Sequence, residues 1–178
     1  MSEIACEKGA FTGRDVAVFF AIACPNAKPA DEEYQALGMM RGKTLSVEWE
    51  TADATADKSA DYTQESLVTY KSVSFSGDGV SRTEEIHNQK ALKRHVMTPG
   101  AATGNQPYVW LKIVSPLDVT EGPFLCTSFE EENPHDDVST WSIECSSAGQ
   151  VTCDDLPVED TTTEEETPTD NTEETPAE

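Results

Sequence analysis

The fold is decided by residues 41–80, which read RGKTLSVEWETADATADKSADYTQESLVTYKSVSFSGDGV. In residues 43–50 every second position is apolar, at Leu45, Val47 and Trp49. Residues 66–76 are rich in Val, Tyr, Thr and Phe. Period-two alternation and this composition predict two half-buried strands. Residues 51–65 contain no large aliphatic side chain and exceed the length of a tight hairpin turn, so they predict a long polar loop between the strands.

The second predicted strand changes phase along its length. Val68 and Tyr70 share one face, whereas Val73 and Phe75 share the other. A β-bulge near Lys71 would produce this shift. A strand that is buried on both faces would produce the same pattern, so both explanations stay open.

The remaining sequence predicts a mainly β fold, a β-sandwich or open barrel with one flanking α-helix. The helix is predicted at residues 83–96, after a capping-box pattern at residues 81–84. A shorter helix is predicted at residues 31–37. Further strands are predicted at residues 15–24, 108–115, 123–130, 138–145 and 150–153. The first of these is apolar on both faces, which predicts a core on one side and a neighbouring subunit on the other.

The charge is strongly negative in two separate parts of the chain. The 178 residues carry a net charge of -22. Residues 154–178 contain eleven acids and no base among Thr and Pro, a composition that predicts a disordered tail. Residues 1–153, with an N-terminal arm at 1–13, form the predicted domain and carry the other -11. This charge disfavours sequence-independent DNA binding. It is compatible with a surface along which nucleic acid slides, and equally with charge that serves solubility.

Cysteine spacing and hydropathy indicate in which cellular environment the chain folds. The five cysteines form no C-x-x-C pair, which disfavours a zinc site and favours a reduced cytosolic environment. Pairing of Cys145 with Cys153 across a hairpin stays open. No apolar run is long enough to span a membrane. The segment before Cys24 resembles a lipoprotein signal, so a secreted or lipid-anchored β-sandwich on an acidic stalk is the alternative interpretation.

No catalytic constellation appears in the sequence. There is no phosphate-binding glycine loop and no nucleophile–base pair, so the prediction is a protein that is not an enzyme and has no cofactor. The best metal-site candidate combines residues 130–132 with His135, Asp136 and Asp137, but its spacing does not match a calcium loop. A solvated acidic loop is the simpler interpretation, and no metal site is expected.

Basic residues gather near the end of the predicted helix, at Lys90, Lys93 and Arg94. They complement the helix dipole, because cations are favourable near a helix C-terminus. An inter-subunit contact is the alternative role for the same three side chains.

The order of these elements resembles the major tail protein, or tail tube protein, of bacteriophages with long non-contractile tails. The resemblance covers roughly residues 13–153 and rests on strand order and on five short motifs, at residues 13–16, 41–47, 75–80, 141–143 and 149–152. It implies a virion protein, assembled in the host cytoplasm, that forms hexameric rings stacked into a tube with an acidic lumen. DNA would pass through this lumen without specific binding.

The resemblance also implies roles for particular residues. The loop would reach the adjacent ring through Thr51, Asp53, Asp57, Lys58, Asp61, Tyr62 and Glu65. Glu48 and Glu50 are candidates for the lumen, because they alternate with the apolar positions of their strand. The implied partners are further copies of the chain and the tail tip, tape-measure and tail terminator proteins. The acidic tail would leave the tube on its outside.

Overall fold

The computed structural model describes residues 10–55 and 63–156, which form eight strands and one α-helix. The helix is α1 (Gln89–Met97), and single 3-10 turns lie at Gly13–Asp15, Asp31–Glu33, Glu85–His87 and Ala101–Thr103. The strands are β1 (Ala17–Ala21), β2 (Gln35–Ala36), β3 (Met40–Asp53), β4 (Ser66–Val80), β5 (Tyr108–Val114), β6 (Asp118–Glu132), β7 (Thr140–Ser147) and β8 (Thr152–Asp155).

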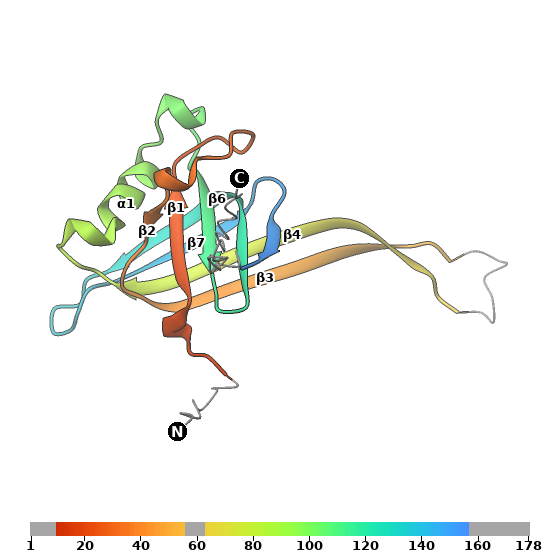
Figure 1. Cartoon of the computed structure of the whole chain (residues 1–178), viewed down its shortest axis with the longest axis horizontal. Helices are drawn as coiled ribbons and strands as arrows, with labels where there is room; N and C mark the ends of the chain where they lie inside the picture. Colours follow the sequence, from red (N-terminus) through yellow and green to blue (C-terminus); the bar gives the residue numbers. More distant parts are fainter. Residues whose placement is uncertain (1–9, 56–62, 157–178) are drawn as a thin grey trace, which may run out of the picture.

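All eight strands belong to one antiparallel sheet in the order β2-β1-β5-β6-β7-β4-β3, with β8 also paired to β6. The long strand β6 pairs with β5 along its first part and with β7 along its second. A register shift between Cys126 and Ser128 leaves Thr127 unpaired, and such a bulge bends a strand. The sheet curls, so β1 and β5 cross in front of β3 and β4 (Figure 1). The prediction of a mainly β fold with one short flanking helix is confirmed, as an open sheet.

The core lies inside the curl and is filled by alternate residues of five strands. Its largest fully buried side chains include Phe20, Phe75, Phe124, Leu111 and Ile143. Helix α1 closes one end through Leu92 and His95, which are both buried. The His95 ring nitrogen lies 2.9 Å from the Tyr108 carbonyl oxygen. Burial lowers the pKa of this imidazole, so its neutral form donates the hydrogen bond.

The two edges of the sheet approach each other at one end. Lys43 on β3 donates hydrogen bonds from Nζ to the carbonyl oxygens of Gly13 (2.9 Å) and Val16 (2.6 Å), just before β1. Partial burial lowers the pKa of this ammonium. The side chain therefore links β3 at one edge of the sheet to the segment that leads into β1.

The predicted helix boundary is wrong, because α1 begins at Gln89 and not at residue 83. Asn88 has a positive φ of 55° and separates α1 from the preceding 3-10 turn. The Gln89 amide donates to the carbonyl oxygens of Gly38 and Val80 and accepts from the Arg82 N–H. These tertiary bonds hold residues 81–84 outside the helix, so the expected capping box does not start it.

Other boundaries also differ from the predictions. The predicted helix at residues 31–37 is one 3-10 turn, Asp31–Glu33, followed by β2. Strand β6 continues to Glu132, so residues 130–132 belong to a strand and not to a loop. Cys145 lies opposite Cys126, with 3.5 Å between the sulfur atoms, and not opposite Cys153. Within residues 10–55 and 63–156, no helix is long and apolar enough to cross a membrane.

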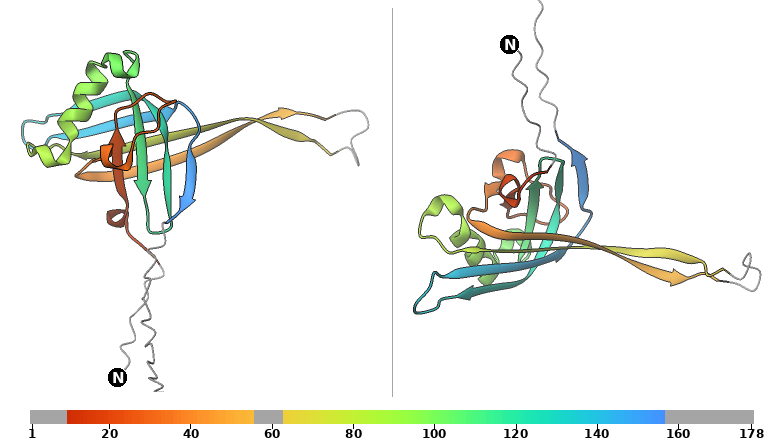
Figure 2. Two further views of the ribbon diagram at one scale, coloured as in Figure 1. Left: turned by 45° about the horizontal axis from the view of Figure 1, so that its top comes forward. Right: turned by 90° about the horizontal axis from the view of Figure 1, so that it is seen from below.

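Strands β3 and β4 extend beyond the rest of the sheet as a two-stranded ribbon (Figures 1 and 2). The pairing of β4 with β7 ends at Ser74, whereas its pairing with β3 continues to Ser66. We call residues 48–72 the arm; residues 56–62 lie outside the described part. The predicted loop is therefore too long at its start, because Thr51–Asp53 belong to β3. The bulge predicted near Lys71 is confirmed and lies at Thr69, where the register shifts.

Replacing Gly79 by alanine is expected to destabilise the subunit. A Cβ at Gly79 would lie 2.6 Å from the Met39 carbonyl oxygen and 2.9 Å from Trp141 Nε1, so backbone must shift. Overpacking of this kind costs about 1–3 kcal/mol of unfolding free energy, which urea denaturation measures. Gly100→Ala is the control, because a Cβ there meets no atom within 4 Å. Equal stability of the two variants would contradict the prediction.

Candidate functional site

One face of the sheet formed by β3, β4, β7 and β6 turns away from the core and is polar. Side chains alternate between the two faces of a strand, and the register aligns the alternation of all four strands. We call this surface the polar face: Thr44, Ser46, Glu48, Glu50, Ser72, Ser74, Ser76, Asp78, Ser128, Glu130, Glu132, Thr140, Ser142, Glu144 and Ser146. Two less polar residues, Tyr70 opposite Glu50 and Leu125 opposite Ser146, share the same register.

The polar face carries only negative charge. It contains six acidic residues and no Lys or Arg. A hollow of about 650 Å³ lies at one end of this face, lined by Asp78, Glu130, Glu132, Thr140 and Ser142 and also by Glu131 and Trp141. Hydroxyl groups of Ser and Thr fill the spaces between the acids, so the surface is well hydrated and presents no cation to an anionic polymer.

The two acids singled out from the sequence both lie on this face. Glu48 pairs with Ser72 and Glu50 with Tyr70, and both glutamates are exposed. Sequence reasoning missed four further acids, Asp78, Glu130, Glu132 and Glu144. Glu144 could have been found, because it alternates with Ile143 and Cys145. Glu130 and Glu132 were hidden by their acidic neighbours, which are typical of a loop.

The arm is apolar as well as charged, and much of its apolar surface is exposed. Trp49 is 58% exposed, Leu67 65% and Tyr70 72%. A two-stranded ribbon is marginally stable in water without a further layer. The arm therefore has the composition of a segment that packs on another molecule.

The loop residues chosen from the sequence divide between the arm strands and the part that is not described. Thr51 and Asp53 lie on β3, and the Glu65 carbonyl oxygen accepts a 2.8 Å hydrogen bond from the Ala54 N–H. Hydrogen bonds from Thr55 lower the pKa of Asp53, so its carboxylate stays ionised. The other four predicted residues lie outside the described residues: Asp57, Lys58, Asp61 and Tyr62.

The basic residues of α1 are not equivalent. Lys93 forms an ion pair with Glu131 of β6 in the same subunit. Lys90 and Arg94 are exposed and line a groove of about 260 Å³ together with Glu85, Asn88 and Ala91. Two of the three predicted inter-subunit residues therefore face solvent in the isolated subunit.

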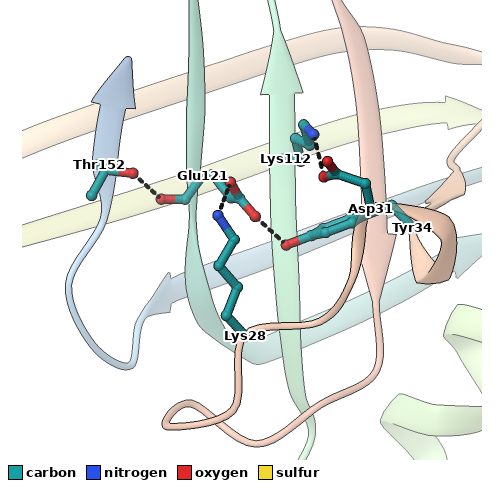
Figure 3. A network of polar contacts seen from close by, with 6 residues as sticks. All are labelled: Lys28, Asp31, Tyr34, Lys112, Glu121 and Thr152. Carbon is teal, nitrogen blue, oxygen red and sulfur yellow. Dashed lines mark hydrogen bonds and ion pairs between the residues drawn. The ribbon is translucent and has the colours of Figure 1, made fainter.

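A polar network covers the outer side of β5 and β6 (Figure 3). Glu121 accepts hydrogen bonds from Lys28 Nζ (2.8 Å) and the Tyr34 hydroxyl (2.6 Å), and Lys112 Nζ lies 2.8 Å from Asp31 Oδ1. Burial raises the pKa of Glu121, but the bonds from Lys28 and Tyr34 outweigh it, so the pKa is lowered overall. The network holds the segment between β1 and β2 against the sheet.

This segment corrects one expectation about β1. Trp110 on β5 is 9% exposed and donates a 2.9 Å hydrogen bond from Nε1 to the Cys24 carbonyl oxygen. Ala21, its partner on β1, is also buried. The second face of β1 is therefore covered by the chain's own residues after β1, and not by a neighbouring subunit at these positions.

The structure offers little support for a metal site. Among the described residues, no group of three or more His, Cys, Asp or Glu side chains is placed to hold a metal ion. His135 is 99% exposed at its side chain and lies 3.7 Å from Asp136. The acids at residues 130–132 are distributed along β6, where alternation separates their side chains.

Comparison with solved structures defines the class of fold. The tail of an empty gene transfer agent (GTA) particle matches with a TM-score of 0.60 and 20% identity, over 80% of this chain and 98% of that chain. The SPP1 tail tube matches with a TM-score of 0.57 and 13% identity, over 83% and 80%. The sheath-tube complex of the PVC contractile injection system matches with a TM-score of 0.55 and 7% identity, over 84% and 94%. The chain shares its fold with proteins of these three assemblies.

The chain belongs to the phage tail tube protein family, whose model matches residues 11–153. No curated protein matches the sequence. The chain is accordingly a structural, non-enzymatic component of the virion tail that assembles with further copies of itself into a tube. This membership decides against the secreted or lipid-anchored module and against an enzyme.

Proposed function

We propose that the chain forms hexameric rings that stack into a tail tube, with the polar face lining the channel through which DNA passes. The carrying observation is the polar face itself, with six acids and no Lys or Arg. The GTA tail, which contains a protein of this fold, has six-fold symmetry. In a hexamer the six acids of each subunit would give each ring 36 negative groups.

The physical advantage of such a lining is that DNA does not adhere to it. DNA binding without sequence preference requires Lys or Arg to replace the counterions on the phosphates. A channel lined by carboxylates and hydroxyl groups offers no such replacement and repels the phosphates. The duplex then slides in a layer of water and ions.

The arm and the two ends of the chain also have proposed positions in the tube. The arm reaches the adjacent ring, and Thr51, Asp53 and Glu65 lie at its described end. Strand β8 pairs with β6 as far as Asp155, so the tube domain extends beyond the predicted boundary at residue 153. Most of the predicted N-terminal arm (1–13) and of the predicted acidic tail (154–178) lies outside the described residues, and we propose that the tail leaves the tube on its outside. We propose that the ends of the tube bind the tail tip, tape-measure and tail terminator proteins, and that assembly occurs in the host cytoplasm.

Electron microscopy of the purified full-length chain over a concentration series tests the assembly. Hollow tubes or six-fold rings are expected, with the polar face on the inner wall in a reconstruction. A channel lined by the opposite face, with Glu48 and Glu144 on the outside, would contradict the proposal. Rings with a symmetry other than six-fold would contradict the hexamer. The reconstruction would still show which face of the sheet lines the channel.

Reversing charge on the polar face is expected to slow DNA ejection. The triple substitution Glu130→Lys, Glu132→Lys and Glu144→Lys places 18 cations in each hexameric ring. At low salt these cations should bind the phosphates and hold the DNA in the tube. Ejection should become faster as salt is raised from about 50 to 200 mM, because phosphate contacts weaken steeply over this range. The measurement is the ejection rate of virions that carry the variant.

The matched control for this experiment is a triple reversal outside the polar face, Glu32→Lys with Asp154→Lys and Asp155→Lys, at three exposed acids on the 3-10 turn before β2 and on β8. Its virions should eject DNA at the parental rate and with parental salt dependence. Equal slowing of both variants would show that the lining is not responsible.

A further inference from the structure

We infer that the groove of α1 receives the described end of the arm from a subunit of the next ring. This inference rests on the proposed function and adds the acceptor surface, which is formed by Lys90 and Arg94 with Ile86 and Met97 beside them. The occupant is a second copy of this chain.

The two surfaces lie at opposite ends of the subunit. Strand β4 begins in the arm at Ser66 and ends at Val80, close to the 3-10 turn and α1 that follow it. In Figure 1 the arm projects to one side of the sheet, while α1 lies toward the other. Identical subunits that stack head to tail bring opposite ends together in every contact. The arm of one subunit therefore meets the α1 end of another.

The α1 groove is lined by two cations, Lys90 and Arg94, and by one acid, Glu85, together with Asn88 and Ala91. Lys90, Ala91, Arg94 and Met97 follow at helical spacing and are all exposed. Met97 is 71% exposed, and Ile86, the neighbour of Glu85 in the sequence, is 76% exposed. Positions 82–94 hold four of the chain's twelve Lys and Arg residues against two acids, so this segment is net positive in an acidic protein.

The described end of the arm has the complementary surface. Asp53 and Glu65 are exposed acids, near the pair that Asp53 forms with Ser66. Leu67 is 65% exposed and Val68 57% exposed on the adjoining part of β4. Acids would face Lys90 and Arg94, and the aliphatic side chains would cover Ile86 and Met97.

Charge also disfavours the other surface at the α1 end. The connection between β6 and β7 follows Glu130, Glu131 and Glu132 and contains Asp136 and Asp137. An acidic arm would be repelled there, because like charges at an interface suppress binding. The α1 groove is the surface at this end whose charge attracts the arm.

Charge reversal and rescue test the pairing in purified full-length protein, with tubes counted by electron microscopy and pelleted by centrifugation. Arg94→Glu should raise the concentration needed for tubes by roughly tenfold or more, because each contact replaces an attraction by a repulsion. Arg14→Glu is the matched control on the exposed turn before β1, and it should assemble as the parent does. The double variant K90E/R94E should form no tubes.

The rescue identifies the partner of the groove. D53K/E65K should also fail to form tubes, and the combined variant K90E/R94E/D53K/E65K should recover them. Circular dichroism and the melting temperature should match the parent for every variant, because all four residues are exposed. Tubes from K90E/R94E at the parental concentration, or no recovery in the combined variant, would overturn the pairing. Absence of tubes in the parent itself would instead count against the proposed function.

Discussion

Replacing residues 51–69 by Asn-Gly is expected to give a folded subunit that forms no tubes. Glu50 and Tyr70 are directly paired, so a two-residue turn between them closes the shortened hairpin without changing the register. The core is untouched, because Val73 is the core residue of β4 closest to the arm and lies outside the replaced segment. What is lost is the exposed surface around Asp53, Glu65 and Leu67, which we propose contacts the adjacent ring.

Electron microscopy and sedimentation of the purified variant measure the outcome. Single rings or monomers are expected at concentrations where the parent forms long tubes, with an unchanged circular dichroism spectrum. Thr63→Ala combined with Gln64→Ala keeps the length of the arm and is the control, which should assemble normally. Tubes of parental length from the shortened variant would show that stacking does not need the arm.

Phe124→Ala is expected to lower the unfolding free energy by about 3–5 kcal/mol. Phe124 is fully buried and sits where β6 passes from its pairing with β5 to its pairing with β7. Its ring therefore fills the core between the two halves of the sheet, and its loss leaves a cavity. Since a domain of this kind has about 5–15 kcal/mol of stability, much of the margin disappears.

Urea unfolding followed by circular dichroism measures this loss. Phe11→Ala is the matched control, because Phe11 is 44% exposed and its removal opens no cavity in the core. The control should stay within about 0.5 kcal/mol of the parent. Similar losses for the two variants would mean that the core is not centred on Phe124.

Strands with one buried face were predictable, because burial imposes alternation. Trp141, Ile143 and Cys145 marked β7 and are buried. Leu45, Val47 and Trp49 marked β3 by the same alternation, but they are 39%, 49% and 58% exposed, so the expectation that this strand is half buried is wrong for the isolated subunit. Residues 51–65 gave no such signal. The end of β3 was accordingly placed too early, and the acidic end of β6 was assigned to a loop for the same reason.

The helix start failed for a different reason, since Gln89 bonds to segments distant in the sequence. A local capping pattern cannot report the carbonyl oxygen of Gly38. The polar face also needed the structure, because Glu48, Glu130 and Glu144 become one surface only through the pairing of four strands. Two of its six acids, Glu48 and Glu50, were predicted from the sequence. The other four were identified only from the strand pairing of the structure.

The arm also bears on the elasticity of the assembled tail. Each subunit body is a continuous hydrogen-bonded sheet closed by a packed core, and this construction resists deformation. The described residues of the arm form a ribbon of two strands, and the side chains of both strands are exposed on either face. If the arms join adjacent rings as proposed, the tube alternates between stiff rings and more flexible connections. Bending would concentrate between rings, so the bore keeps its diameter while the tail curves.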